Sequence, residues 1–560
     1  MNRLLQLYHM VRHVRGRQLA ARLRLMLRRK WRVRHAVRFR TRMASESLPE
    51  LVLHEPLPLP VMPPRKEGVA IEGGVYTLTF LNESQRFTHP FKWHRAELEY
   101  GTRLWKLNLH YMEFLEGLDD RAFVRVVDDW IRHNPPYRPG YWLDDWNSYA
   151  LSIRCVVWMQ QYAVRHTSFT SDFKGRMLAS LFCQIRFLSR NLELDIGGNH
   201  LIKNTKALLW AGRYFKGSEA EGWYKLGEEL LTRALEEQVL EDGMHYERSP
   251  AYHGQVFVDL LESYTTMKDG AAREKLRVDL KAMAQVLADL THPDGFPSQF
   301  NDGGLHMTYA PEASLAAWRR MTADDLNPRS VFYLPEAGYA GIRSQTTYVL
   351  CDCGKIAPDY LPAHGHGDIF SFEWSVAGKR LIIDAGVYEY NAGPRRAYSR
   401  STRAHNTVTL NGADQCEFWG AFRVARRANV SEVHFEGTPN SFSLAASHDG
   451  YRRLPGKPIH TRIFDVKEDH LKIRDEIRGG AGQAVEAQLL LNPSCEAIIS
   501  NGNVIITLEG IVVQVLTEGE VRLEKGYWYP DFGVEYSCPQ LVIRYGTAPC
   551  TGMFELRRSV

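Results

Sequence analysis

The spacing of the apolar positions changes once along the chain, near residue 335. Between about residues 95 and 320, apolar side chains recur at i, i+3 and i+4, which places them on one face of a helix. Short loops with Gly, Pro or Asn separate these segments. A series of amphipathic helices predicts a helical bundle or toroid. The predicted helices are 104–115, 149–165, 172–190, 200–215, 223–238, 256–267 and 276–290.

After residue 334 the chain contains short stretches rich in Val, Ile, Thr and aromatic residues, interrupted by Gly, Asn and Asp turns. This pattern predicts an antiparallel β-sandwich. The predicted strands include 338–353, 369–376, 380–384, 406–410, 503–508 and 511–516, and most of 430–557 has the same character.

A chain of 560 residues is too long for one hydrophobic core, so we predict a multidomain α+β protein. Residues 1–44 form a basic N-terminal helical segment. Residues 45–94 are rich in proline and form a linker, with a short hairpin at 69–81. Residues 95–335 form the helical domain, and residues 336–560 form the β-sandwich domain.

The positive charge is concentrated at the N-terminus. Residues 1–43 contain 14 Lys or Arg and no Asp or Glu, so removing them from the net charge of +5 leaves −9 on the rest of the chain. No nucleic-acid partner is therefore predicted for the body of the protein. Two interpretations of the segment stay open. Its helix either lies on an anionic membrane surface or a polymer, or is an ordinary solvated or core-packed helix.

No run of about 18 apolar residues predicts a transmembrane helix. No apolar region of roughly 7–15 residues predicts a secretory signal. The expected location is therefore the cytoplasm or the periphery of the inner membrane, reached through the basic N-terminus, with the periplasm as the alternative. The eight cysteines are sparse and are interpreted as free thiols. The sequence predicts no particular oligomeric state.

The densest group of chemically active residues is His364-Gly-His366-Gly-Asp368, followed by Asp384 and His405. Two histidines one residue apart in an extended segment can face the same side. Imidazole and carboxylate ligands from neighbouring strands suit Zn²⁺. The alternative is that this histidine pair arises by chance, because the motif is short.

Three further groups lie in the helical half, around Asn199 and His200, between Asp242 and His253, and from His292 to Asp302. Polar side chains in loops at helix ends can converge on a cleft. The alternative for each is a helix cap or a hydrogen-bonded core residue.

Six motifs occur in one order: GNHLIKNTKALLWAGRYF, DGMHYERSPAYH, HPDG followed by FND, HGHGDIFSFEWS, LIIDAGVYEY and RSTRAHNTV. Together they resemble the heparinase II/III-like polysaccharide lyase family over residues 104–428, more than half of the chain. The resemblance implies an N-terminal (α/α) toroid followed by an antiparallel β-sandwich domain. It also implies β-elimination on a uronate-containing acidic polysaccharide, which leaves a 4,5-unsaturated uronate end.

The resemblance implies a catalytic set of four residues. Asn199 would neutralise the uronate carboxylate with help from His200. Tyr252 matches the catalytic tyrosine, and His364 matches the base used on one C5 epimer. The implied ligands of a structural Zn²⁺ are His366, Asp384 and His405.

Several residues are predicted to contact the polysaccharide. Some relatives use a further tyrosine from the sandwich domain, and the candidates here are Tyr388, Tyr390 and Tyr398. Arg400, in a loop with Arg395, Arg396 and Arg403, could bind carboxylates or sulfates, or could form ion pairs inside the protein. Trp146 could stack on a sugar or fill the core. The chain departs from the family at Lys203, where many members have Glu.

The chemistry explains why these residue types are needed. The C5–H of a uronate is a weak acid, because its removal builds charge next to an existing carboxylate. An amide and a histidine against that carboxylate lower the barrier, as an oxyanion hole does. In the predicted mechanism Tyr252 protonates the leaving O4, and His364 or Tyr252 removes the C5 proton.

Two other functions stay open at this stage. A non-catalytic accessory protein of exopolysaccharide or surface-glycan biosynthesis would bind polymer without cutting it. A glycoside hydrolase would need two carboxyl groups flanking the bond, for which Glu247 and Asp302 are candidates.

Overall fold

The computed structural model describes residues 3–45, 48–94, 101–500 and 503–559. The predicted start of the helical domain at residue 95 lies outside the described residues. Contacts divide the chain into two compact units. The helical unit consists of Arg15–Glu237 and Val258–Leu280, and the β unit consists of Met1–Val14, Gln238–Phe257 and Lys281–Val560.

The N-terminal segment is helical, as predicted. It contains α1 (Arg3–Val11), α2 (Gly16–Arg34) and α3 (Ala36–Ser45). Among the described residues, no helix combines the length and the apolar character that a bilayer span requires. The predicted hairpin is present as β1 (Val69–Glu72) and β2 (Val75–Phe80), and β3 (Glu83–Phe87) adds a third antiparallel strand.

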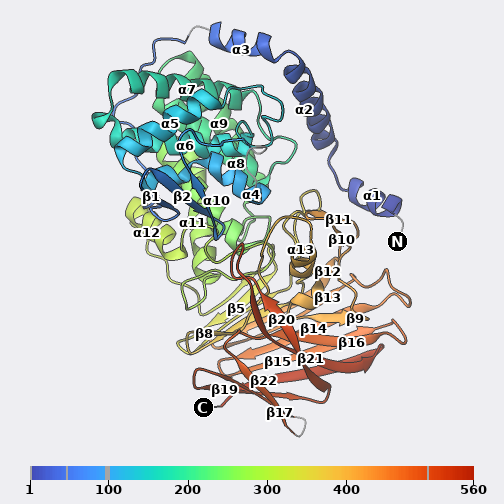
Figure 1. Ribbon diagram of the computed structural model, residues 1–560. Coiled ribbons are helices and arrows are strands. Elements are labelled where there is room, and N and C mark those ends of the chain that lie inside the picture. Colours follow the sequence, from blue (N-terminus) through green and yellow to red (C-terminus); the bar gives the residue numbers. More distant parts are fainter. Residues whose placement is uncertain (1–2, 46–47, 95–100, 501–502, 560) are drawn as a thin grey trace. The chain divides into compact units, whose positions relative to one another are not determined.

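The helices follow closely from the apolar spacing (Figure 1). They are α4 (Arg103–Tyr111), η1 (Glu113–Gly117), α5 (Asp120–His133), α6 (Ser148–Arg165), η2 (His166–Ser168), α7 (Ser171–Ser189), α8 (Gly198–Tyr214), α9 (Ser218–Gln238), α10 (Pro250–Thr266), α11 (Ala271–Asp289) and α12 (Pro311–Thr322). All seven predicted helices are present. α5 is not among the predicted helices, although its buried Phe123, Val126, Val127 and Trp130 follow helical spacing.

Side-chain caps fix where several of these helices begin. The side chains of Asp119, Asn147 and Thr170 accept hydrogen bonds from the first-turn N–H groups of α5, α6 and α7. Such caps satisfy donors that have no partner within the helix. α6 is buried along most of its length and packs against α8, so it forms the centre of the helical unit.

Among the described residues, the β unit contains three antiparallel sheets of four or more strands, which confirms the predicted β architecture. The five-stranded sheet has the order β4 (Val331–Leu334), β5 (Tyr339–Arg343), β6 (Thr347–Asp352), β7 (Phe372–Val376) and β8 (Lys379–Ile382). The four-stranded sheet has the order β20 (Glu520–Trp528), β21 (Tyr536–Thr547), β16 (Ala484–Leu490) and β9 (Val408–Leu410). β4 lies just before the predicted start of the β half at residue 336.

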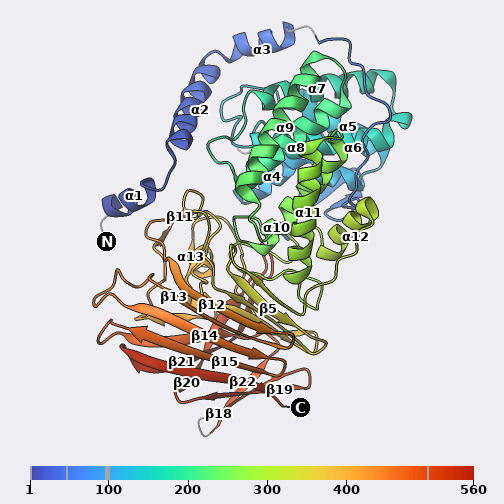
Figure 2. The same ribbon diagram turned by 180° about the vertical axis from the view of Figure 1, so that it is seen from behind.

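The third sheet has eight strands in the order β12 (Val430–Thr438), β13 (Ser441–His448), β14 (Ile459–Lys467), β15 (His470–Arg478), β22 (Cys550–Arg558), β19 (Ile511–Thr517), β18 (Asn503–Leu508) and β17 (Glu496–Ser500). Figure 2 shows β13, β14 and β15 as neighbouring strands. Alternate residues of β14 and β15 are buried, as expected for strands with one face on a core.

Apolar side chains from all three sheets form one core, which includes Val349, Phe464 and Leu541. This core fixes the connections that carry the predicted site. The segment with His364 and His366 joins β6 to β7, and Asp384 follows β8 directly. α13 (Pro394–Arg400), η3 (Thr402–Ala404) and the short strands β10 (Phe418–Trp419) and β11 (Arg423–Val424) flank β9. None of the eight cysteines forms a disulfide among the described residues, in agreement with the prediction of thiols.

Candidate active site

Tyr252 lies in the first turn of α10, and the residues before it explain its position. Pro250 begins the helix, where the missing N–H of proline costs nothing. The Ser249 hydroxyl accepts a hydrogen bond from Tyr252 N at 3.1 Å, which caps the helix. The same hydroxyl donates to the backbone carbonyl of Asp302. One serine therefore ties Tyr252 to the loop that carries Asp302.

Tyr252 belongs to a group of four rings in the β unit. The hydroxyl oxygens of Tyr252 and Tyr390 lie 3.0 Å apart. The imidazole of His364 packs against the Tyr252 ring, with 4.1 Å between the ring centroids. Phe422, 40% exposed, lies beside His364 and Tyr390. Tyr252, His364 and one of the three candidate tyrosines therefore lie together, next to an exposed aromatic ring.

The Tyr390 hydroxyl shares a hydrogen bond with the Tyr252 hydroxyl in which either oxygen can be the donor. Packing around its hydroxyl raises the pKa of Tyr390 well above its ordinary value, and the negative charge of Asp302 adds to this effect. Arg396, 5.0 Å from the centre of the ring, acts in the opposite direction without outweighing it. Tyr390 therefore keeps its proton at neutral pH. A protonated Tyr390 can therefore donate to the Tyr252 oxygen.

Asp302 is a fully buried carboxylate that holds His364 in place. Its Oδ2 accepts from His364 Nδ1 at 2.8 Å and from Arg396 Nη2 at 2.9 Å. Its Oδ1 accepts from His366 Nε2 at 2.9 Å and from Arg396 Nη1. Burial alone raises the pKa of Asp302, but Arg396 and the two histidines hold it well below its usual range. Asp302 is therefore an ionised carboxylate whose two oxygens are fully engaged.

The contact with Asp302 also decides which nitrogen of His364 can act as a base. A proton on Nδ1, directed at Asp302, leaves Nε2 as the basic nitrogen. His364 Nε2 lies 3.6 Å from Oε2 of Glu247, which is buried. The side chain of His364 is 11% exposed, so the imidazole is accessible at one edge.

A second group of the β unit has the composition of a metal site. His366, Asp368 and His405 each bring one ligand atom to a buried position, and these atoms lie within 4.8 Å of one another. In the described part of the chain, His366 Nδ1, Asp368 Oδ1 and His405 Nε2 have no hydrogen-bond partner. Buried polar atoms are nearly always paired, and two imidazoles with one carboxylate form a typical zinc ligand set. These three residues, hereafter the His–Asp–His triad, therefore fit a zinc ion.

Asp384, a predicted zinc ligand, contacts Nδ1 of His405 and not Nε2, the nitrogen that is open to the triad. Asp384 Oδ2 accepts from His405 Nδ1 at 2.8 Å. Asp302 makes the equivalent contact with Nε2 of His366. A carboxylate on the outer nitrogen fixes the orientation of a ligating imidazole. The structure thus brings Asp368 to the two histidines, and the ligand role of Asp384 stays a prediction.

Two consecutive residues clamp the loop that carries these histidines. Asn301 has a left-handed backbone conformation, with φ of 59°. Its N–H donates to Asp368 Oδ2 at 2.7 Å, and its side-chain oxygen accepts from His366 N at 2.9 Å. The backbone N–H of Asp302 donates to the carbonyl of His364 at 3.0 Å. The same short segment therefore positions the catalytic candidate and the triad.

Asn199 and His200 lie in the helical unit, in the first turn of α8. Gly197, with φ of 73°, provides the backbone turn that leads into the helix. His200 Nδ1 lies 3.2 Å from Glu193 Oε1, and its ring packs on Tyr149 with 4.3 Å between centroids. The N-terminal end of a helix carries partial positive charge and favours a bound carboxylate. The position of Asn199 and His200 is therefore chemically suited to a uronate carboxylate.

Lys203, where the sequence departs from the family, belongs to a buried charge network in the helical unit. Its Nζ donates to Asp259 Oδ2 at 2.7 Å. Lys206 Nζ donates to the other Asp259 oxygen at 2.6 Å and to Glu262 Oε2 at 2.7 Å. The departure is therefore compensated by an acidic partner on α10.

Two of the three candidate tyrosines lie apart from the Tyr252 hydroxyl in the described contacts. The ring of Tyr388 packs against Tyr529 and the guanidinium of Arg395, with 4.2 Å from that guanidinium to the ring centre. The hydroxyl of Tyr398 accepts from Tyr527 N at 3.1 Å. Their predicted contact with substrate stays a prediction.

Arg400 and Trp146, also predicted to bind substrate, are buried. Arg400 donates from two nitrogens to the carbonyl of Gly365, each at 3.2 Å, and from the third to Ala421. These bonds hold the backbone between His364 and His366. Trp146 donates to the carbonyl of Asn134 at 3.0 Å within the core of the helical unit. Both environments favour a positioning or packing role, and the predicted sugar contacts stay untested.

Some functional residues were not identified in these roles from the sequence. The sequence predicts Asp302 and Glu247 only as hydrolase carboxylates, and Asp368 only as part of the histidine motif. Arg396 was considered as a polymer contact, but its guanidinium pairs with Asp302. The spacing HGHGD, with Asp two residues after the second histidine, is the one local signal that could have suggested Asp368 as a ligand.

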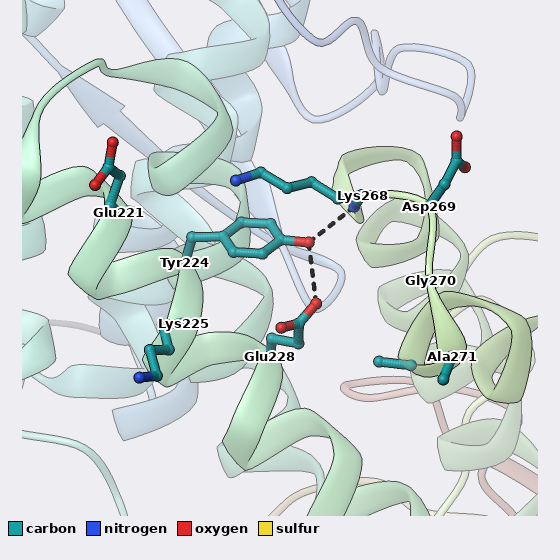
Figure 3. A pocket seen from close by; sticks show the side chains of 9 residues that line it. Glu221, Tyr224, Lys225, Glu228, Lys268, Asp269, Gly270 and Ala271 are labelled. Atoms are coloured by element: carbon teal, nitrogen blue, oxygen red, sulfur yellow. Dashed lines mark hydrogen bonds between the residues drawn. The ribbon is translucent and has the colours of Figure 1, made fainter.

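A surface pocket of the helical unit lies between α9 and the segment joining α10 to α11 (Figure 3). Its Tyr224 hydroxyl accepts from Lys268 N at 2.8 Å and lies 3.2 Å from Glu228 Oε1. None of the predicted site residues lines it.

Two family models match most of the chain. Residues 93–327 match the heparinase II/III N-terminus, and residues 326–552 match the heparinase II/III-like C-terminal region. The chain therefore belongs to the heparinase II/III-like family.

Three relatives are similar in sequence. A heparin-sulfate lyase of Bacteroides thetaiotaomicron is 24% identical over 426 residues, which cover 68% of this chain and 58% of the relative. A heparin-sulfate lyase of Pedobacter heparinus is 26% identical, with 52% and 48% covered. The FtsZ-localized protein C of Caulobacter vibrioides is 23% identical, with 67% and 65% covered. The chain thus spans about half the length of these lyases.

Two solved structures show the same fold. A heparinase III structure superimposes with a TM-score of 0.68 at 18% identity, covering 84% of this chain and 79% of that one. A heparan sulfate lyase from Pedobacter heparinus superimposes with a TM-score of 0.61 at 19% identity, covering 85% and 79%. The predicted arrangement of an (α/α) toroid followed by an antiparallel β domain is confirmed.

Proposed function

We propose that this protein is a polysaccharide lyase that cuts a uronate-containing acidic polysaccharide by β-elimination. The observation that carries the proposal is the grouping of Tyr252, Tyr390 and His364, with Asp302 bonded to the outer nitrogen of His364. The heparin-sulfate lyase relatives support the same chemistry and favour it over a non-catalytic binding role.

In the proposed reaction, Asn199 and His200 supply donors for the carboxylate of the uronate. That contact stabilises the charge that develops when the C5 proton leaves. His364 Nε2 accepts the C5 proton on one epimer, because its Nδ1 proton is fixed by Asp302. Tyr252 accepts it on the other epimer, where the Tyr390 hydroxyl can donate to the Tyr252 oxygen. Tyr252 in its protonated form donates to the O4 leaving group.

The geometry argues against the hydrolase alternative. A hydrolase needs a carboxylic acid that can protonate the glycosidic oxygen. Asp302 is fully buried, ionised, and bonded through both oxygens to His364, His366 and Arg396. It therefore has neither the proton nor the access for that role.

A zinc ion in the His–Asp–His triad is a further part of the proposal. His366, Asp368 and His405 would hold it, with Asp384 as the predicted alternative ligand. When bound, it would supply charge neutralisation to a buried carboxylate and fix both imidazoles. His366 and His364 both bind Asp302, so fixing His366 also positions the catalytic candidate.

The test is incubation of the purified protein with a panel of uronate polysaccharides. The expected product absorbs in the ultraviolet as a 4,5-unsaturated uronate. Tyr252→Phe is expected to lower kcat by about 10²–10⁴, and Asn199→Ala by about 10²–10³. The matched control is Tyr333→Phe, which removes a hydroxyl from a tyrosine that packs on Phe435.

The product distinguishes the alternatives. Chain cleavage without the ultraviolet signal would indicate a hydrolase. Retention on an immobilised polysaccharide without cleavage would indicate an accessory protein. Full activity in both Tyr252→Phe and Asn199→Ala would remove the catalytic assignment.

A further inference from the structure

The apolar face of α2 points away from the protein. Leu19, Leu23, Met26, Leu27 and Trp31 recur at helical spacing, and between 44% and 57% of each side chain is exposed. Such a stripe normally packs on the core of a soluble protein. Figure 1 shows α2 as one uninterrupted helix (dark blue).

The opposite face of α2, which contacts the helical unit, is polar and basic. Arg32 is buried and donates to Asn191 Oδ1 at 2.8 Å. Gln18 on the same face is buried as well. Arg15, just before the helix, pairs with Glu237. The helix is thus attached to its unit by these polar contacts and by the partly buried Val33, and packing on that unit does not account for the apolar stripe.

Basic side chains lie beside the stripe and at its C-terminal end, and residues 1–43 contain no acidic residue. Arg24, Lys30 and Arg34 are exposed along α2. Residues 1–43 contain 14 Lys or Arg and no Asp or Glu. In the β unit, α1 repeats the arrangement, because Leu4 and Tyr8 are 74% and 63% exposed at a spacing of four residues.

We propose that this N-terminal segment binds the surface of an anionic lipid membrane. An interfacial helix needs Leu, Met and Trp to enter the acyl boundary and Lys or Arg to meet anionic headgroups. A nucleic acid would use the basic residues but not the apolar stripe. A second copy of the chain would cover the stripe but would meet repulsion between the basic side chains. The membrane surface matches both the apolar side chains and the charge.

The test is flotation of the full-length protein with lipid vesicles. Vesicles of phosphatidylcholine with about 30% phosphatidylglycerol carry the negative surface that attracts basic segments, whereas pure phosphatidylcholine does not. We expect binding to the anionic vesicles, weaker binding to the neutral ones, and a loss of binding as salt screens the charges.

Two sets of variants separate the apolar and charged contributions. Leu23→Gln with Leu27→Gln is expected to weaken vesicle partitioning at least about tenfold, because it removes buried apolar area. Arg24→Gln, Lys30→Gln and Arg34→Gln together should weaken binding to anionic vesicles about a hundredfold. Glutamine preserves helix propensity, so the helix itself is retained. The matched control is Val278→Gln, an exposed apolar residue (52%) on α11, which should bind as the wild type does.

Three results would overturn the proposal. One is the absence of vesicle binding by the wild-type protein. Another is binding that the charge variant weakens but Leu23→Gln with Leu27→Gln leaves unchanged, together with equal binding to a polyanion such as single-stranded DNA. The third is a dimer in solution that the apolar variant dissociates, which would assign the stripe to a second copy.

Discussion

Two histidine–carboxylate groups of the β unit use the same residue types and even share His366, but they differ in how their polar atoms are satisfied. Asp302 accepts hydrogen bonds from His364, His366 and Arg396 and is saturated. Within the described residues, the His–Asp–His triad leaves one buried atom on each residue without a hydrogen-bond partner. An unsatisfied buried polar atom costs about 1–3 kcal/mol. The first group is thus complete within the protein, whereas the second is where we propose a zinc ion.

The largest expected effect comes from breaking the complete group. Asp302→Ala leaves the buried guanidinium of Arg396 uncompensated, so we expect a loss of about 3–5 kcal/mol in the free energy of unfolding. Urea-induced unfolding of the full chain measures it. A loss below about 1 kcal/mol would mean that Arg396 does not depend on Asp302.

Metal removal is expected to act on the second group. If zinc is present at about 100 times its Kd, chelation should remove roughly 2.7 kcal/mol of stability. His405→Ala should abolish both the zinc content, measured by elemental analysis, and the response of the Tm to chelator.

The matched control for this prediction is His253→Ala. His253 is a buried histidine that does not belong to the triad. Its Nε2 lies 2.9 Å from the carbonyl oxygen of Met283. This variant should lose stability but keep its zinc. Unchanged zinc content in His405→Ala would contradict the triad assignment.

A third buried carboxylate, Asp475, extends the comparison to the pH dependence of stability. Asp475 pairs with Arg462 and His460 in β14 and β15. Burial raises the pKa of Asp475, but Arg462 and His460 outweigh burial and hold it below the ordinary value. A depressed folded-state pKa stabilises the protein above about pH 4, and this stability is lost as pH falls further.

We therefore expect wild-type stability to decrease by on the order of 2 kcal/mol between pH 5 and pH 2 from this group alone. Asp475→Asn should remove that part of the slope while lowering stability near pH 7. Unfolding curves at a series of pH values test this expectation. Parallel profiles for the two proteins would show that Asp475 titrates normally.

The smallest effect is expected at an exposed ion pair. Arg522 Nη1 and Glu486 Oε1 lie 2.8 Å apart, and both side chains are partly exposed. Because water screens such a pair, Glu486→Ala should change the free energy of unfolding by less than about 1 kcal/mol. A larger loss in the same urea experiment would weaken the link between burial and cost that underlies the comparison.

Periodicity predicted the elements more reliably than it predicted their contacts. The seven predicted helices are present, and caps such as Asn147 lie where residue type suggests. α5 is missing from the predicted set although its apolar spacing is regular. The motifs single out Tyr252 and His364, because both lie in distinctive local sequences, and the structure packs their rings together. The role of Asp302 was not predictable, because its partners lie 62 to 94 residues further along the chain.

The sequence by itself determined the change from helices to strands, the basic N-terminal segment and the two histidine motifs, because spacing and composition are local properties. Only the tertiary structure decided which of Tyr388, Tyr390 and Tyr398 meets Tyr252, and which carboxylate joins His366 and His405. It also turned Arg400 inward onto backbone carbonyls and the apolar face of α2 outward. The physical reason is that these outcomes depend on sheet register, loop routes and the pairing of buried charges. Those contacts join residues that no local pattern relates.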